Sequence, residues 1–138
     1  MIDRIDVQPN DRFLLLSIPE PSFLAELAAR LPAGLIVGLG AGEEVTEARR
    51  EARDLDNVML VPATPDDIPW QDSFFTKAVD AAGRWPPSGK TSAELARVLA
   101  PGASVYLAGP PSARDPLLAA GFCLVSLDES MLIVVRSG

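Results

Sequence analysis

Residues 122–137 read FCLVSLDESMLIVVRS, and this stretch limits the kind of sheet that the chain can form. Apolar residues dominate 122–128 and 131–137, as is typical of strands, and only Glu129 and Ser130 lie between the two runs. So short a link joins antiparallel strands only, because a parallel pair needs a crossover of about a dozen residues or more. The sequence therefore predicts a C-terminal antiparallel hairpin.

Upstream of this hairpin, apolar strand patterns alternate with helical patterns. Strands are expected at 12–18, 34–40, 57–63, 75–82 and 104–109, and helices at 22–31, 43–55, 91–100 and 114–121. This alternation predicts a doubly wound, Rossmann-like α/β fold, with a mostly parallel seven-stranded sheet that ends in the hairpin. Residues 1–138 are expected to form a single domain, because a chain of this length buries about two thirds of its unfolded surface.

Capping and helix-breaking residues predict where the helices begin and end. Ser22 is the expected N-cap of the helix at 22–31, and Thr91 or Ser92 that of the helix at 91–100. The second of these helices should stop at Pro101-Gly102, since proline cannot continue a helix and glycine readily ends one.

The charge of the chain argues against nucleic-acid and membrane partners. Lys and Arg number 12 against 19 Asp and Glu, which gives a net charge of -7, and no basic cluster interrupts the sequence. The first residues, MIDRIDVQPN, lack the apolar segment of a signal peptide. No apolar run approaches the roughly 18 residues of a membrane span. We therefore expect a soluble, cytoplasmic protein.

The absence of histidine narrows the chemistry further. It excludes Ser-His and Cys-His nucleophiles and most zinc sites. The single cysteine, Cys123, stands inside an apolar run and is expected to pack as a small core residue. No metal site and no catalytic residue is predicted, and Asp80 is expected to be a strand-end acid that faces solvent.

Three segments, in order along the chain, resemble one known family. Residues 94–109, ELARVLAPGASVYLAG, are similar to a helix that ends in RxLxPGG and leads into an apolar strand. Residues 57–82 resemble a strand, an acidic loop, a DxSFD-like turn and the next strand, and 117–127 resemble a last helix with the sixth strand. These segments are similar to those of class I S-adenosylmethionine-dependent methyltransferases, of the type 11 kind. The resemblance implies the methyltransferase fold for nearly the whole chain.

Aligned with the family in this way, LIVGLGAGEEV at 35–45 covers the second strand and the start of the helix that follows it. This register makes these glycines the end of the second strand, where the family carries an acid that binds the ribose hydroxyls of the cofactor, and Gly40 stands in that place. The family's GxGxG loop after the first strand is replaced by SIPEPS at 17–22. A competing register, with the glycine segment as first strand, leaves 12–31 unexplained and omits a strand–helix unit. The first register is therefore preferred.

These departures from the family pattern weaken the expected cofactor site. Pro19 and Pro21 lack an amide N–H, and Glu20 places a carboxylate where the cofactor's own carboxylate would lie. Loss of the two ribose hydrogen bonds alone costs about 3–6 kcal/mol, or about 10² to 10⁴ in affinity. Thr64 stands in place of the acid that faces the adenine, although Asp66 or Asp67 can substitute if the loop shifts.

Two functions stay open at this point. The preferred one is a methyltransferase-like module with a degenerate cofactor site, which is non-catalytic, holds no cofactor, and binds a protein partner or forms a homodimer. The alternative is a divergent S-adenosylmethionine-dependent small-molecule methyltransferase. Its cofactor would then lie against Ser17, Glu20, Gly38, Gly40, Thr64, Asp66 and Asp67.

The two functions predict different states of the cleft at the carboxyl ends of the strands. A non-enzyme should fill the cleft with side chains, for which Trp70 and Trp85 are the candidates, or use it as an interface, whereas an enzyme must leave it open. Trp85, between Arg84 and Pro86-Pro87, is also a candidate contact residue for a partner.

Overall fold

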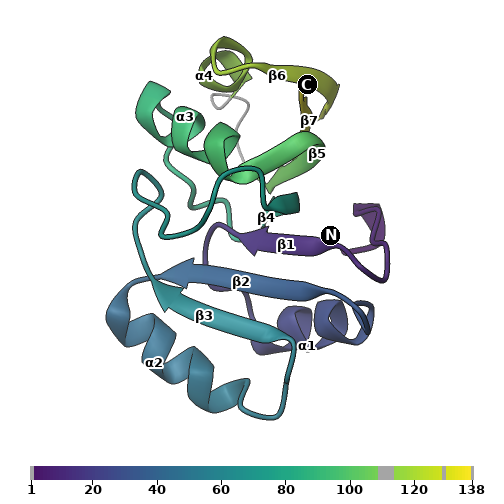
Figure 1. Cartoon of the computed structure of the whole chain (residues 1–138), viewed down its shortest axis with the longest axis vertical. Coiled ribbons are helices and arrows are strands. Elements are labelled where there is room, and N and C mark those ends of the chain that lie inside the picture. The colour runs from purple at the N-terminus through teal and green to yellow at the C-terminus, as the bar shows by residue number, and fades with distance from the viewer. Residues whose placement is uncertain (1, 109–113, 129, 138) are drawn as a thin grey trace.

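The computed structural model describes residues 2–108, 114–128 and 130–137, and Figure 1 shows the arrangement of the elements. Within these residues, a seven-stranded sheet has the order β3-β2-β1-β4-β5-β7-β6. Its strands are β1 (Arg12–Leu15), β2 (Leu35–Gly40), β3 (Val58–Pro62), β4 (Phe75–Asp80), β5 (Leu99–Ala108), β6 (Phe122–Leu127) and β7 (Met131–Arg136). Only β7 runs against its neighbours; it is antiparallel to both β5 and β6. The predicted doubly wound sheet with an antiparallel C-terminal hairpin is therefore confirmed.

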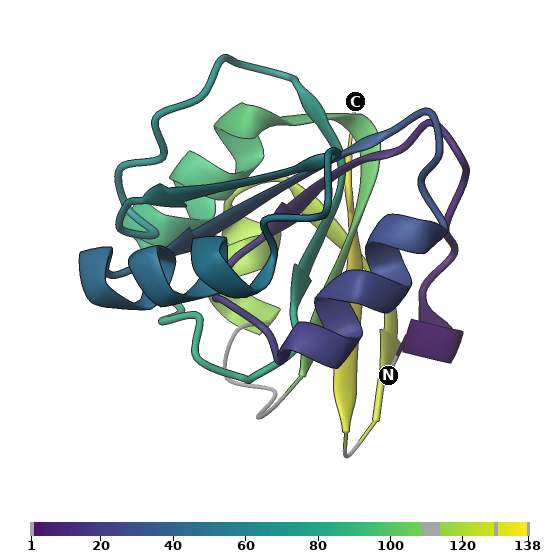
Figure 2. The same ribbon diagram turned by 90° about the horizontal axis from the view of Figure 1, so that it is seen from below.

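Helices cover both faces of this sheet, as Figure 2 shows from a second direction. They are the short 3₁₀ helix η1 (Ile2–Arg4), α1 (Pro21–Ala29), α2 (Gly42–Glu51), α3 (Gly89–Val98) and α4 (Arg114–Ala119). The apolar residues of α1 and α2 share one buried cluster, and those of α3 and α4 share the other. Among the described residues, no helix is long and apolar enough to cross a membrane.

The central strand β1 divides its side chains between the two clusters by alternation. Phe13 and Leu15 of β1 join the α1–α2 side, whereas Leu14 and Leu16 join the α3–α4 side. Continuous apolar runs such as RFLLLSI are required for this arrangement, because a central parallel strand buries both of its faces.

The pairing of β1, β2 and β3 confirms the preferred register. Leu15 of β1 pairs with Gly38 of β2, and Gly40 at the end of β2 pairs with Pro62 of β3. Gly40 is thus the last residue of the second strand, as the family resemblance implied, and the segment at 12–15 is the first strand.

Two predicted helix caps are wrong. Glu20 is the N-cap of α1 and makes no side-chain cap hydrogen bond, while Pro21 takes the first helical position, for which its fixed φ suits it. The N-cap of α3 is Ser88, whose Oγ accepts a hydrogen bond of 3.0 Å from the amide of Thr91. The hydroxyl of Thr91 accepts one from the amide of Ser88 in return, so Thr91 is the inner partner of a capping box.

The predicted stop at Pro101-Gly102 is also wrong. The helix α3 ends at Val98, and Pro101-Gly102 lies in an irregularity of β5. There the pairing with β4 jumps from Phe75↔Leu99 to Lys77↔Ser104, so β5 carries extra residues that Gly102 accommodates with a φ of +84°.

Cys123 is exposed, which corrects its predicted place in the core. The cause is the sheet order, because β6 is an edge strand that pairs with β7 alone. An apolar run predicts a strand, but it does not predict whether both faces of that strand are covered.

Candidate functional site

The residues predicted to hold a cofactor all lie near the carboxyl ends of β1 to β3. Ser17 and Glu20 follow β1, Gly38 and Gly40 end β2, and the segment 64–67 follows β3. In open α/β sheets, ligands bind in the crevice outside these strand ends. The contacts made by the chain's own side chains at this edge therefore decide what the site can hold.

Asp80, the last residue of β4, forms hydrogen bonds with both the loop after β1 and the loop after β4. Its carboxylate accepts a hydrogen bond of 2.9 Å from Ser17 Oγ and one of 2.8 Å from the backbone amide of Trp85. Asp80 is only 2% exposed, so its predicted position as a solvent-facing acid is wrong. The predicted cofactor residue Ser17 is thus engaged in a structural contact.

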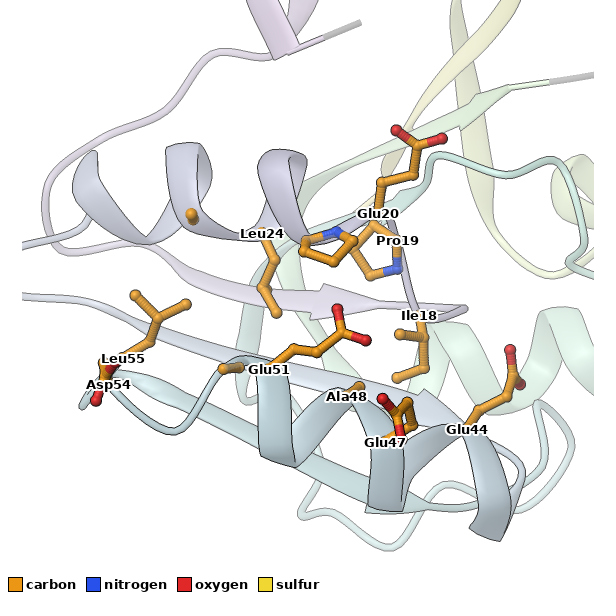
Figure 3. Close-up of a pocket in the computed structure, with 13 residues that line it drawn as sticks. Ile18, Pro19, Glu20, Leu24, Glu44, Glu47, Ala48, Glu51, Asp54 and Leu55 are labelled. Atoms are coloured by element: carbon orange, nitrogen blue, oxygen red, sulfur yellow. The ribbon is translucent and has the colours of Figure 1, made fainter.

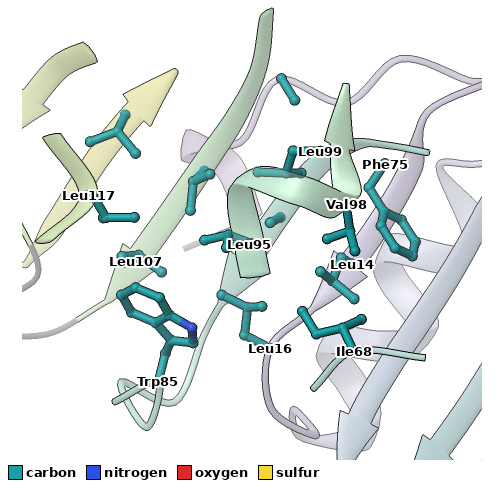
Figure 4. Close-up of a cluster of buried hydrophobic side chains, with 14 of the residues drawn as sticks. Leu14, Leu16, Ile68, Phe75, Trp85, Leu95, Val98, Leu99, Leu107 and Leu117 are labelled. Atoms are coloured by element: carbon teal, nitrogen blue, oxygen red, sulfur yellow. The ribbon is translucent and has the colours of Figure 1, made fainter. Parts of the chain in front are cut away.

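The two tryptophans occupy different parts of the molecule. Trp85 is 6% exposed and belongs to the same buried cluster as Leu16, Leu95 and Leu107, as Figure 4 shows. It therefore plugs the region beside the end of β4, as one of its two predicted roles requires, and is not available as an exposed contact residue. Trp70 packs against Phe75 at the start of β4, with ring centroids 5.8 Å apart, and so lies toward the opposite end of that strand from Asp80.

Other side chains of this protein lie against the backbone of Gly38 and Gly40. A Cβ atom on Gly38 would meet Leu60 Cδ2 at 2.7 Å, and one on Gly40 would meet Ile18 Cγ1 at 2.7 Å. Neither glycine has a positive φ. Close packing of Leu60 and Ile18 on the backbone of β2 therefore accounts for Gly38 and Gly40, but not for Gly42, where a Cβ would meet no atom within 4 Å.

An ion pair links the start of α2 to the loop after β4. The guanidinium of Arg84 donates to Glu44 Oε2 at 3.1 and 3.0 Å, and Glu44 Oε1 accepts from the amide of Ala41 at 3.4 Å. The side chain of Arg84 is 53% exposed, so the pair adds little to stability. It does neutralise Glu44, whose carboxylate lies beside Gly40.

The loop after β3 satisfies its own polar groups. Thr64 Oγ1 donates to Asp66 Oδ1 at 2.7 Å, and the amide of Asp67 donates to the carbonyl of Thr64 at 3.1 Å. Lys90 Nζ lies 3.5 Å from Asp66 Oδ2. The hydrogen bond from Thr64, with the charge of Lys90, lowers the pKa of the Asp66 carboxyl. Hydrogen bonds within the loop therefore hold Thr64, Asp66 and Asp67 in one turn.

Two hollows lie near this edge, and Glu20 borders both. One, of about 340 Å³, separates the loop after β1 from the loop after β4 and is lined mainly by Ile18, Phe23, Ala81 and Ala82. The other, of about 400 Å³, is a groove between α1 and α2, shown in Figure 3. Neither is lined by the remaining predicted residues, Ser17, Gly38, Gly40, Thr64, Asp66 and Asp67.

Neither of these two hollows therefore brings the predicted cofactor residues together. The sequence interpretation missed Ile18 and the pair of Arg84 with Glu44. One signal for Ile18 was available, since an apolar residue stands between Ser17 and Pro19 where the family carries glycines. Within the described residues, no group of three or more His, Cys, Asp or Glu could hold a metal ion.

Comparison with known proteins gives the fold a family context. No protein-family model matches the chain, and no curated protein matches it. A chain of the complex between the Haloferax volcanii Trm112 methyltransferase activator and a protein assigned as a methyltransferase has a TM-score of 0.82 at 17% identity, over 99% of this chain and 86% of that one. A SAM dependent methyltransferase from Aquifex aeolicus has a TM-score of 0.81 at 18% identity, over 97% and 85%.

A third similar structure carries a different activity. The [4+2]-cyclase SpnF has a TM-score of 0.81 at 15% identity, over 98% of this chain and 77% of that one. One fold thus supports more than one chemistry, and at these identities the likeness concerns the fold alone. The chain has the class I fold of S-adenosylmethionine-dependent methyltransferases.

Proposed function

We propose that this protein is a non-catalytic module with the methyltransferase fold, which does not bind S-adenosylmethionine and acts by binding a protein partner. The observation that carries the proposal is the position of Ile18 against Gly40 at the end of β2. An apolar side chain fills the place where an acid and the ribose hydroxyls would meet.

Further contacts support the loss of cofactor binding. Pro19 and Pro21 offer no amide N–H to an anionic group, and the carboxylate of Glu20 would repel one. Ser17 and Asp80 are already bonded to each other. The Haloferax complex gives a precedent for a protein partner on this fold, although the precedent belongs to that protein.

Calorimetric titration with S-adenosylmethionine and S-adenosylhomocysteine tests the proposal. We expect no heat of binding up to about millimolar ligand, since the lost contacts cost about 10² to 10⁴ in affinity. The Aquifex aeolicus methyltransferase serves as the positive control in the same buffer. Saturable binding at micromolar concentration would overturn the proposal.

One observation favours the alternative, a divergent small-molecule methyltransferase. The hollow of about 340 Å³ between Phe23 and Ala81-Ala82 leaves space at the strand ends. A cofactor held there would contact Phe23, so loss of binding in a Phe23→Ala variant would identify this site. The same titration therefore distinguishes the two functions.

A further inference from the structure

We propose that the groove between α1 and α2 docks a basic amphipathic helix of a partner protein. This inference deepens the proposed function, because it names the surface and the chemistry of the partner. It concerns a site distinct from the strand-end edge, apart from the residues that border both, which are Ile18, Pro19, Glu20 and Glu44.

The floor of the groove is apolar. It is formed by Ile18, by Leu24 and Ala25 of α1, and by Ala48, Ala52 and Leu55 on and after α2. The alanines explain why the groove exists, since their short side chains leave about 400 Å³ open between the two helices. Apolar side chains of a partner that enter this space would leave water, which favours binding.

The rim of the groove is acidic. Its carboxylates are Glu20, Glu44, Glu47, Glu51 and Asp54, and no lysine or arginine is among the described residues that line it. Glu44 pairs with Arg84 and Glu47 with Arg50. In the described part of the chain, Glu20, Glu51 and Asp54 have no ion-pair partner, so the rim keeps an excess of negative charge. An occupant with positive charges beside its apolar face complements this surface.

The shape of the groove favours a helix over a compact small molecule. The α2 residues that line it, Glu44, Glu47-Ala48, Glu51-Ala52 and Leu55, recur every three or four positions along the whole helix and the turn after it. The 10 residues of α2 span about 15 Å, or nearly three turns. An elongated apolar channel between two helices is the usual seat for apolar side chains of a third helix at i, i+3, i+4 and i+7.

A synthetic peptide tests this inference directly. The probe is an acetylated, fluorescently labelled peptide of about 14 residues with leucine at helical a and d positions and lysine elsewhere. We expect saturable binding to the wild-type chain by fluorescence anisotropy. A matched peptide with glutamate in place of every lysine should not bind, and equal binding of both peptides would overturn the inference.

Two pairs of variants locate the docking site. Glu47→Lys/Glu51→Lys should weaken binding by about tenfold or more, while Glu43→Lys/Asp56→Lys, with the same change in net charge away from the groove, should not. Ala25→Trp should block the groove, whereas Ser22→Trp, at an exposed position of α1 that does not line the groove, should leave binding intact. All six substitutions in these four variants lie at exposed positions, and far-UV circular dichroism checks that each variant folds. Binding that is absent in the wild type, or equal in both members of a pair, would overturn the inference.

The remaining outcomes are distinguishable as well. Concentration-dependent dimers in sedimentation velocity that Ala25→Trp abolishes would assign the groove to a second copy of this chain and overturn the inference. Micromolar S-adenosylmethionine binding together with peptide docking in the groove would refute the proposed loss of cofactor binding and support the docking site. If the cofactor titration gives no heat and the peptide does not bind, the proposed loss of cofactor binding is supported and the docking site is refuted.

Discussion

Ile18 lies so close to the backbone of Gly40 that a Cβ atom at position 40 would stand 2.7 Å from Ile18 Cγ1. No side chain fits at position 40 while Ile18 keeps its place. The acid expected of the family at this position and the isoleucine side chain in its present position therefore exclude each other. The contact between Ile18 and Gly40 thus links two features of this strand end, the missing acid and the apolar side chain that lies there.

The first prediction is a coupling between these two positions. Gly40→Ala should lower the free energy of unfolding by about 1–3 kcal/mol in the wild type, because the new methyl group collides with Ile18. In an Ile18→Ala background the same change should cost clearly less. Urea unfolding of the four proteins gives the coupling energy. Gly42→Ala is the control, since a Cβ there meets no atom within 4 Å; equal costs of Gly40→Ala in both backgrounds would contradict the contact.

The second prediction concerns the buried carboxylate of Asp80. Asp80→Ala should lower the free energy of unfolding by about 1–3 kcal/mol, because the amide of Trp85 then has no acceptor. Asp80→Asn should cost less, since its carbonyl can accept from Trp85 while Ser17 Oγ accepts from its amide. Thermal unfolding of both variants, with Ser17→Ala as the single-bond control, measures the difference. If Ala and Asn are equally harmful, the hydrogen bonds are not what holds this edge together.

Local patterns account for the parts of the fold that were predicted correctly. The hairpin follows from a link too short for any other pairing, and the place of Gly40 follows from its distance to the strand that starts near Asn57. Both depend on the spacing between segments that are consecutive along the chain. The caps of α1 and α3 were missed by a few residues only. Pro21 takes the first position of α1, and Ser88 competes with Thr91 and Ser92 as the N-cap of α3.

The errors concern properties that arise from distant parts of the chain. Asp80 is buried because Ser17, far away in sequence, bonds to it. Cys123 is exposed because β7 stands between β6 and the rest of the sheet. The groove between α1 and α2 depends on the relative position of two helices whose own patterns indicate only that each is amphipathic. Hydrophobic periodicity carries none of this information.

The third prediction tests the buried ion pair at the opposite end of β1. Asp11 Oδ2 lies 2.9 Å from Lys77 Nζ and also accepts from the amide of Gln8 at 2.8 Å. Lys77→Met alone should cost about 3–5 kcal/mol because it leaves a buried charge without a partner, whereas Asp11→Asn/Lys77→Met should cost less. The free energies of unfolding of the two variants and the wild type are compared by chemical unfolding at neutral pH. A double variant as unstable as the single one would show that the charges are not interdependent.

The same pair has a defined pH dependence. Burial alone would raise the pKa of Asp11, but the hydrogen bonds from Lys77, Gln8 and Thr76 outweigh it and lower the pKa below the ordinary value of 3.8. The folded state therefore binds a proton less readily than the unfolded state, and the stabilisation is present above pH 3.8 and lost as the pH falls below it. The free energy of unfolding should fall more steeply below pH 4 in the wild type than in Asp11→Asn/Lys77→Met.

The fourth prediction concerns the exposed thiol. Cys123 should react with a disulfide reagent such as DTNB in the native protein, to completion and without denaturant, because the edge strand leaves it accessible. The rate should change little when urea is added below the unfolding transition. A reaction that begins only with unfolding would show that Cys123 is buried, as the sequence pattern alone had predicted.

The last prediction concerns Arg97, which lies in the segment that most resembles the methyltransferase family. Its guanidinium donates to the carbonyls of Ile68 and Trp70, each at 2.8 Å, and to the carboxylates of Glu94 and Asp72, each at 2.7 Å. Arg97→Lys should lower the free energy of unfolding by about 1–3 kcal/mol, because an ammonium cannot serve four acceptors in the plane of a guanidinium.

Hydrogen exchange separates this local effect from a general loss of stability. The amide of Ile68 donates to Glu94 Oε2 at 2.6 Å, and Glu94 is held in place by Arg97. In Arg97→Lys this amide should exchange faster by more than the global change in stability explains, while amides in β5 follow the global change. Arg53→Lys, at an exposed position, is the matched control and should alter neither. Unchanged exchange at Ile68 in Arg97→Lys would mean that the loop at 68–74 is held by its apolar contacts alone, and the arginine of the family-like segment would then need another explanation.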